Sequence, residues 1–408
     1  MRLSSFISGS QLTLPLTLNP VSPTSNHTAS LLSAEYGTTF NVEVTLANQT
    51  FKLLVDTGSS DTYVVRQDFV CIDQTTNLEI GQEACRHASQ TYNQSSTYHV
   101  IKNQTFGVQY GNGIASGVMA YEDVTLAGIT VPGQIVGIAD HSTPMGDGVN
   151  SGVLGLAYPS LTSAHPGNHT DNTTFFFDRE VYSPLFSTMY EQGLVEEPYF
   201  SIALAHTPRN FSTPTFGGYL TLGDLPPVAY KAEFSEVPVE ILENVPPVFT
   251  SGKRTRSYWA FTVSAVTFGS AVNSNTNTTS MTTNPTPFQV FTDTGNNFSI
   301  LSAEIVDPIN ALFNPPAVYN EDLGVSVVDC DAEAPIFGVE IGGQMFYHDG
   351  EDLIFQIDDG VCVSSFLASE SVSYEGIVLN VLGVPFLKNV VSVYDFGNNE
   401  LRFAQRVD

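Results

Sequence analysis

The sequence predicts an all-β protein built from two similar lobes. Aromatic residues are abundant, with 27 Phe and 17 Tyr among 408 residues, and hydrophobic residues make up 42% of the chain. Together with many Val and Thr residues, these side chains fit the pleated, half-buried surface of a sheet. Short runs of alternating polar and apolar residues recur between Gly, Asn, Asp and Pro. One five-residue motif occurs twice, which indicates two lobes.

The alternating runs give the positions of the expected strands. The clearest runs cover residues 40–46, 51–55, 106–110 and 390–396. Two polar stretches without such a pattern, residues 160–174 and 273–287, are predicted to be surface loops.

Few helices are expected. A Ser-Pro pair at residues 183–184 is typical of a helix start, and Gly193 is typical of the end of that helix. Ser302 is expected to cap a second helix over residues 303–313, which Pro308 would kink or shorten.

The duplicated motif is LVDTG at residues 54–58 and FTDTG at residues 291–295. Each copy is followed later by an apolar-apolar-Gly run, at residues 153–155 and 381–383. A single Asp-Thr-Gly is usually an ordinary turn. Two copies at strand ends, each with its own later run, predict two lobes that face each other across a pseudo-twofold axis.

The charge balance excludes several classes of partner. The chain has 42 acidic and 14 basic residues, a formal charge of −28 at pH 7. Nucleic-acid backbones and anionic membrane surfaces would be repelled, so we expect neither as a partner. No apolar run reaches the roughly 18 residues of a membrane span. Protonation of carboxylates in an acidic compartment would relax the repulsion between them.

Four cysteines and nine N-x-S/T sequons point to the secretory pathway, so we expect a secreted or vacuolar protein. The cysteines permit three disulfide pairings, and reduced core cysteines are the alternative. We favour Cys71–Cys85 and Cys330–Cys362, since each pairing closes a local loop. Neither a CxxC pair nor a His-rich cluster is present, so we expect no metal site and no cofactor. The sequons begin at Asn26, Asn48, Asn93, Asn103, Asn168, Asn172, Asn210, Asn277 and Asn297.

Asp56 and Asp293, one in each motif, are the candidate catalytic residues. In metal-free peptide hydrolysis, one carboxylate can take a proton from water while a neighbouring carboxylic acid donates to the peptide carbonyl. Two carboxyls close enough to share one proton provide both forms at one pH, because both cannot readily ionise. We assign the protons to the pair rather than to either residue.

The residues beside the two aspartates suit this chemistry. The glycine of each motif allows a tight turn that brings backbone N–H groups near the carboxylate. The threonine of each motif can hydrogen-bond across the lobe junction, and the serine after the first motif can donate to its aspartate. These supporting residues are Thr57, Gly58, Ser59, Thr294 and Gly295.

Residues 106–113 predict a hairpin beside the site. Alternating apolar residues lead into an Asn-Gly pair, a strong hairpin signal. Tyr110 lies next to the tip at Gly111 and Asn112, where a mobile hairpin could close over a substrate. On its own, such a hairpin more often has a structural role without a function in substrate binding.

From about Tyr36 to Ala404, the chain resembles the pepsin-like aspartic peptidases. The resemblance implies a bilobal acid protease fold with a central cleft, catalytic Asp56 and Asp293, and Tyr110 as the flap tyrosine. It also implies an extended peptide substrate with hydrophobic side chains around the cleaved bond. The motifs that carry it are LLVDTGSSDTYVV (53–65), QYGNGIASG (109–117), SGVLGLAYPS (151–160), EQGLVEEPYFSIAL (191–204), FTDTGNNFSIL (291–301) and VYDFGNNELRFA (393–404).

The resemblance also gives a domain division and a functional expectation. We expect an N-terminal extension over residues 1–35, a first lobe over 36–205 and a second over 206–408. The expected function is that of a monomeric endopeptidase acting on peptides or proteins. The alternative is a catalytically impaired protein of the same fold that binds a peptide, a polysaccharide or an enzyme. The presence of both aspartates and of the flap tyrosine favours catalysis.

Three positions depart from the family pattern. The family usually has Thr or Ser where this chain has Asn296, whose amide is expected to donate to the outer oxygen of Asp293. Tyr63 replaces a tryptophan behind the flap and keeps an aromatic ring with a polar tip. Val384 replaces an aspartate, which removes a carboxyl near Asp293.

Overall fold

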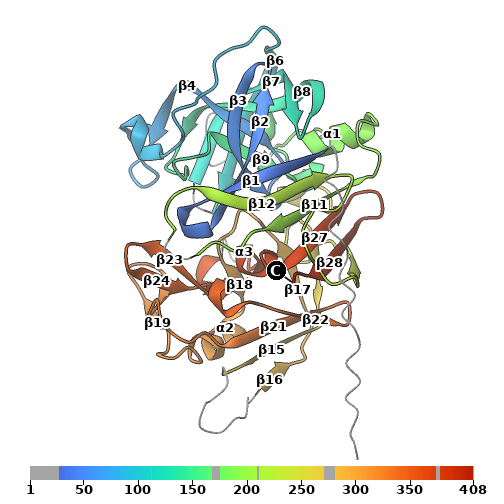
Figure 1. Cartoon of the computed structure of the whole chain (residues 1–408). Helices are drawn as coiled ribbons and strands as arrows, with labels where there is room; N and C mark the ends of the chain where they lie inside the picture. Colours follow the sequence, from blue (N-terminus) through green and yellow to red (C-terminus); the bar gives the residue numbers. More distant parts are fainter. Residues whose placement is uncertain are drawn as a thin grey trace, which may run out of the picture.

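The computed structural model describes residues 27–111, 113–167, 175–208, 211–270, 281–373 and 377–407. It confirms the predicted class: two lobes of β-sheet with a few short helices (Figure 1). The longest described α-helix has eight residues, so none in this part of the chain is long enough to cross a membrane.

The largest sheet has 15 strands and runs from the N-terminal lobe through the middle of the molecule (Figure 1). Its central strands β1, β12, β11, β27 and β28 come from both halves of the chain and lie between the two lobes. In hydrogen-bonding order the strands are β10 (Ala164–Pro166), β6 (His99–Tyr110), β7 (Gly113–Leu126), β8 (Ile129–Ser142), β4 (Thr62–Ile72), β9 (Gly152–Gly155), β3 (Gln49–Asp56), β2 (Thr39–Leu46), β1 (Thr28–Ala34), β12 (Thr215–Leu222), β11 (Tyr199–Leu204), β27 (Val390–Asp395), β28 (Glu400–Gln405) and β13 (Ser235–Pro238), with β5 (Glu79–Ile80) paired to β4.

Three smaller sheets form the C-terminal lobe, drawn in yellow to orange in Figure 1. One contains β14 (Ala260–Val263), β17 (Phe288–Thr292), β26 (Val381–Leu382), β18 (Ser299–Leu301) and β25 (Phe366–Ala368). The second contains β16 (Met281–Asn284), β15 (Ala265–Gly269), β21 (Ile336–Ile341) and β22 (Gln344–Tyr347). The third contains β19 (Val318–Asn320), β20 (Val325–Val328), β24 (Val361–Ser364) and β23 (Ile354–Asp358).

The sequence repeat corresponds to a structural repeat. Strand β3 runs parallel to β9, with Asp56 opposite Gly155. Strand β17 likewise runs parallel to β26, with Thr292 opposite Leu382. The N–H of Asp293 then donates to the Leu382 carbonyl at 3.2 Å. Each aspartate therefore stands at the end of a strand that pairs with the later apolar run, as the sequence predicted.

A buried aromatic cluster joins the lobes beneath this repeat. Trp259 has no solvent exposure, and its indole N–H donates to the Leu156 carbonyl of the N-terminal lobe at 3.0 Å. The Trp259 ring lies 5.2 Å from the ring of Tyr394, which stacks on Phe200 at 4.7 Å. Close-packed aromatic rings of this kind resist sliding, so they fix the relative position of the two lobes.

The expected strands are confirmed, since residues 40–46, 51–55, 106–110 and 390–395 lie in β2, β3, β6 and β27. The two loop predictions were wrong in part. Residues 164–166 form β10, which pairs with β6, and residues 281–284 form β16, which pairs with β15. Both are short edge strands formed by long-range backbone pairing, which leaves no alternating pattern in the sequence.

The two expected helices are present with small differences. Helix α1 (Leu185–Glu191) ends before Gly193, but its N-cap is Pro184, and the Ser183 hydroxyl instead donates to Glu191 at 2.9 Å. Helix α2 (Ala303–Asn310) contains Pro308 and ends before the predicted residue 313. A third helix, α3 (Val384–Leu387), was not predicted.

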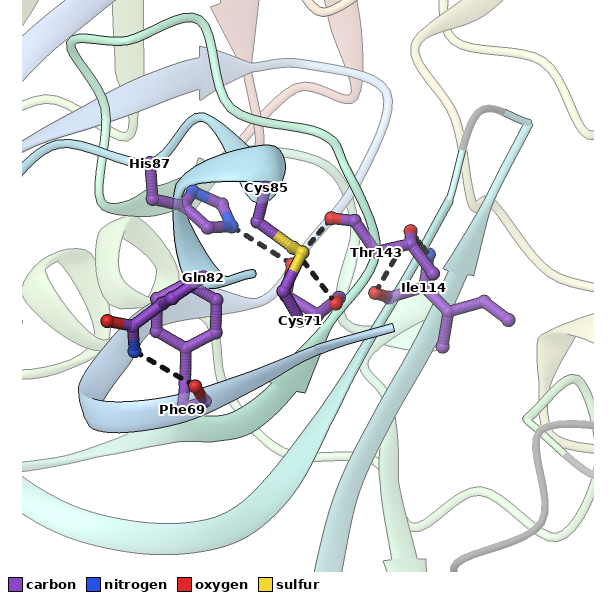
Figure 2. The surroundings of a disulfide bond; sticks show 8 residues. Phe69, Cys71, Gln82, Cys85, His87, Ile114 and Thr143 are labelled. Carbon is purple, nitrogen blue, oxygen red and sulfur yellow. Dashed lines mark hydrogen bonds between the residues drawn. A yellow bond between two sulfur atoms is a disulfide. The ribbon is translucent and has the colours of Figure 1, made fainter. Parts of the chain in front are cut away.

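Both favoured disulfides are confirmed, Cys71–Cys85 and Cys330–Cys362. Figure 2 shows the first, which joins β4 to the 3-10 helix η2 (Gln82–Cys85). Thr143 lies beside it and exchanges hydrogen bonds with Ile114 of strand β7, at 2.9 and 3.0 Å. Ile114 lies one residue beyond the turn pair Tyr110–Gly113, so this contact and the disulfide support the tip end of the β6–β7 hairpin.

Replacing Cys71 and Cys85 together by Ala should lower the free energy of unfolding by about 3 kcal/mol, because the unfolded chain regains the entropy of an open loop. Denaturation in guanidinium chloride, followed by fluorescence, measures this change. An unchanged denaturation midpoint would contradict it. The Cys330→Ala, Cys362→Ala pair is the matched comparison in the other lobe.

Candidate active site

The two Asp-Thr-Gly turns meet at the lobe junction. A Cβ atom added to Gly58 would lie 2.5 Å from the carboxyl carbon of Asp293. One added to Gly295 would lie 2.8 Å from Oδ1 of Asp56 and 3.2 Å from Oδ1 of Asp293. Each glycine therefore packs against the carboxyl of the opposite motif. The side chains of Asp56 and Asp293 are also close enough to hydrogen-bond to each other.

The two threonines bind the turns to each other. The Thr57 N–H donates to the Thr294 hydroxyl oxygen at 3.0 Å, and the Thr294 N–H donates to the Thr57 hydroxyl oxygen at 3.1 Å. The hydroxyls then donate onward, from Thr57 to the Thr292 carbonyl at 3.2 Å and from Thr294 to the Val55 carbonyl at 2.7 Å. Both threonines are completely buried, so this symmetric network replaces all their contacts with water.

The hydrogen bonds to the two carboxyls are not symmetric. Asp56 accepts from the Gly58 N–H at 2.8 Å and from the Ser59 hydroxyl. Asp293 accepts from the Gly295 N–H at 2.8 Å and has no side-chain donor corresponding to Ser59 among the described residues. Asp56 is buried, whereas Asp293 keeps more contact with solvent.

The electrostatics of the pair follow from this arrangement. Burial raises the pKa of Asp56, and the hydrogen bonds from Ser59 and Gly58 act in the opposite direction. Burial raises the pKa of Asp293 well above its usual range, and the negative charge of Asp56 raises it further. A proton bound to the pair is thus favoured on the Asp293 side.

The expected amide contact from Asn296 is absent from the described structure, which corrects that expectation. The Asn296 side-chain oxygen accepts from the Phe298 N–H at 3.0 Å, so the side chain faces its own turn. The Asn296 carbonyl accepts from the N–H of Val384 at 2.9 Å. Asn296 thus supports the loop and the start of α3, because a local Asx turn competes successfully for its side chain.

Strands β6 and β7 form the predicted hairpin, with Tyr110 opposite Gly113. Gly111 is exposed at the turn, and Asn112 lies outside the described residues. Burial raises the pKa of the Tyr110 hydroxyl, and the nearby Tyr63 and Asp56 raise it further. Tyr110 therefore lies near the first aspartate and packs against the cluster that contains Tyr63.

A third carboxyl, that of Asp61, is buried near the dyad, and it was not predicted from the sequence. Asp61 has no solvent exposure, and its Oδ1 accepts from the Tyr182 hydroxyl at 2.6 Å and from the Ser163 N–H at 2.8 Å. Asp61 lies inside a quoted motif, but its partners come about a hundred residues later. A local sequence pattern therefore could not have predicted these contacts.

The described residues contain no group of three or more side chains suited to holding a metal ion.

Two lobes joined by a central sheet, with one Asp-Thr-Gly turn from each meeting at the junction, define the class of acid proteases. The chain belongs to the eukaryotic aspartyl protease family, which it matches over residues 35–406. This confirms the resemblance seen in the sequence, and the protein is an aspartic endopeptidase by family.

Individual relatives agree with this membership. The chain is 39% identical to a probable aspartic-type endopeptidase of Aspergillus fumigatus, over 92% of this chain and 80% of the relative. It is 24% identical to pepsin A of Bos taurus, over 87% and 80% of the two chains. In fold it is similar to an aspartic proteinase from Irpex lacteus, with a TM-score of 0.67, 20% identity, and 93% and 97% of the chains covered.

Replacing Gly58 or Gly295 by Ala should lower kcat/KM by roughly a hundredfold, because the added methyl displaces the opposite carboxyl. Peptide hydrolysis measures the loss. Gly350→Ala is the matched control, since a Cβ there meets only Ala334 at an ordinary 3.5 Å. Full activity in both dyad variants would show that the close approach of the turns is unimportant.

Proposed function

We propose that this protein hydrolyses peptide bonds with a water molecule activated between Asp56 and Asp293. The observation that carries this proposal is the mutual packing of the two turns, which brings the two carboxyls within hydrogen-bonding distance of each other. General acid–base catalysis needs this convergence on the reacting atoms.

The two carboxyls take different parts in the proposed reaction. Asp56, with donors at Gly58 and Ser59, is the better anion and accepts the water proton. Asp293, which has a strongly raised pKa and fewer donors, holds the shared proton and gives it to the peptide carbonyl. The environments of the pair thereby separate the base from the acid.

The substrate in this proposal is an extended peptide held between the lobes and the β6–β7 hairpin. Tyr110 covers the dyad from the hairpin and limits access of bulk water. Backbone hydrogen bonds position such a peptide, while hydrophobic pockets select the side chains around the cleaved bond. We propose lobes at residues 36–205 and 206–408, and a monomer.

We also propose that the protein passes through the secretory pathway and acts outside the cell or in the vacuole. It is supported by the two disulfides, which persist in oxidising compartments. Relatives at similar coverage include a probable vacuolar protease A of Trichophyton verrucosum, 25% identical over 95% of this chain.

Asp56→Asn and Asp293→Asn should each lower peptide hydrolysis by about a hundredfold to ten-thousandfold, because each removes one proton-transfer group without changing its shape. A mixed peptide library, digested from about pH 3 to about pH 7 and analysed by mass spectrometry, measures the loss. Asp307→Asn, at an exposed carboxyl on α2, is the control.

Cleavage that persists in both dyad variants would refute the assignment. A wild-type protein that binds peptides without cutting them would instead support the non-catalytic alternative.

Asn296→Ser should place a hydroxyl donor beside Asp293, as Ser59 does for Asp56. A donor favours the charged carboxylate, so the shared proton should be lost at lower pH. The alkaline limb of the kcat/KM profile should then move down by roughly one pH unit. A shift to higher pH, or none, would contradict the described asymmetry. The control is Asn314→Ser, which lies away from the dyad.

A further inference from the structure

Arg179 brings a positive charge to the edge of the catalytic site. Its Nε donates to the Phe175 carbonyl at 3.0 Å, within its own segment. Its Nη1 donates weakly, at 3.5 Å, to the carbonyls of Leu161 and Phe249. Leu161 ends the 3-10 helix η3 (Pro159–Leu161) of the N-terminal lobe, and Phe249 lies in η5 (Pro247–Thr250) of the C-terminal lobe. The guanidinium therefore lies where the lobes meet.

The neighbours of Arg179 are also neighbours of the dyad. The charge of Arg179 partly offsets the rise that burial causes in the pKa of Tyr258. Burial lowers the pKa of Arg179, and Tyr110, the tyrosine near Asp56, acts in the opposite direction. The charges of Asp293 and Asp56 also raise the pKa of Tyr258. The centroid of the Tyr258 ring lies 4.4 Å from that of Phe291, two residues before Asp293. Arg179 and the dyad thus share Tyr110 and Tyr258 as neighbours.

The charge of Arg179 is not neutralised by an ion pair. No carboxylate in the described part of the chain lies within 4.0 Å of it. Against the effect of burial, Asp61 is the carboxyl that raises the pKa of Arg179. Asp61 itself accepts hydrogen bonds from Tyr182 and Ser163. Burial raises the pKa of Asp61, so this carboxyl tends to be neutral in acid, whereas a guanidinium stays charged.

The segment that carries Arg179 is firmly attached. The Glu180 N–H donates to the Ala164 carbonyl of β10 at 2.8 Å. The His165 ring nitrogens lie 2.8 Å from the Gly107 carbonyl of β6 and 3.1 Å from the Phe177 carbonyl. Because the side chain is already oriented, less conformational entropy is lost when a ligand binds.

The Arg179 side chain keeps partial exposure to solvent, although burial lowers the pKa of its guanidinium. We propose that Arg179 is a specificity-determining residue that binds a carboxylate of the peptide substrate on its side of the cleaved bond. The carboxylate belongs either to an acidic side chain or to the C-terminus of a short peptide. The Nη2 group has no hydrogen-bond partner among the described residues, and Nη1 makes only weak bonds at 3.5 Å, so these two nitrogens can offer a carboxylate two parallel hydrogen bonds. Elsewhere this acidic protein, with its charge of −28, repels such groups. The inference rests on the proposed peptidase function.

The test uses matched peptides that differ only in one charge. Glu replaces Gln at each position from P3 to P3′ in one series, and a free C-terminus replaces the amide in the other. The wild-type enzyme, assayed at about pH 5, where a peptide Glu is largely ionised, should prefer the charged peptide of one pair by about tenfold in kcat/KM. The pair that shows this preference identifies the source of the carboxylate.

Arg179→Gln should reduce that preference ratio to about one, and Arg179→Lys should leave an intermediate ratio, because an ammonium lacks the planar fork. The ratio is independent of the amount of folded enzyme. Arg66→Gln, at an exposed arginine outside the site, should keep the wild-type ratio. The wild-type ratio should also fall as the salt concentration rises, a measurement that needs no variant.

A wild-type ratio near one at every position, or a ratio insensitive to salt, would overturn the inference while leaving the peptidase intact. A ratio retained in Arg179→Gln would do the same and would leave Arg179 as a counter-charge to Asp61. If the wild-type enzyme cleaved none of the peptides, both the proposed function and this inference would fail.

Discussion

The reciprocal packing of the two Asp-Thr-Gly turns is the constraint on which the site depends. Each glycine leaves just enough room for the carboxyl of the other motif, and each threonine hydrogen-bonds to the other turn. Beneath them, the buried indole of Trp259 bonds to Leu156 across the junction. Two lobes linked so closely hold two carboxyls at a separation that neither lobe could set alone.

The two Asp-Thr-Gly turns have similar backbones, but their aspartates differ in hydrogen bonding and in pKa. Ser59 donates to Asp56, while the corresponding Asn296 turns back to its own loop and leaves Asp293 with a backbone donor. Burial then raises both pKa values but is opposed more strongly at Asp56. The difference between Ser59 and Asn296 therefore gives the two carboxyls different hydrogen-bond environments.

The segments around the dyad are held by contacts within the N-terminal lobe. The hairpin that carries Tyr110 is braced close to its turn by Thr143 and the nearby disulfide (Figure 2). The segment around Arg179 is hydrogen-bonded to β10 through the Glu180 N–H. Supporting contacts of this kind keep the side chains near a site in fixed positions.

The sequence by itself determined the lobed β-architecture, the duplicated Asp-Thr-Gly turns and both disulfides, because these depend on local turn chemistry that occurs twice and on cysteines spaced for local loops. It did not reveal the edge strand β10 or the orientation of Asn296. It also could not place Asp61 beside Tyr182, or Arg179 near Tyr258. Those relations join residues far apart in the chain through packing and backbone pairing, so only the tertiary structure decided them.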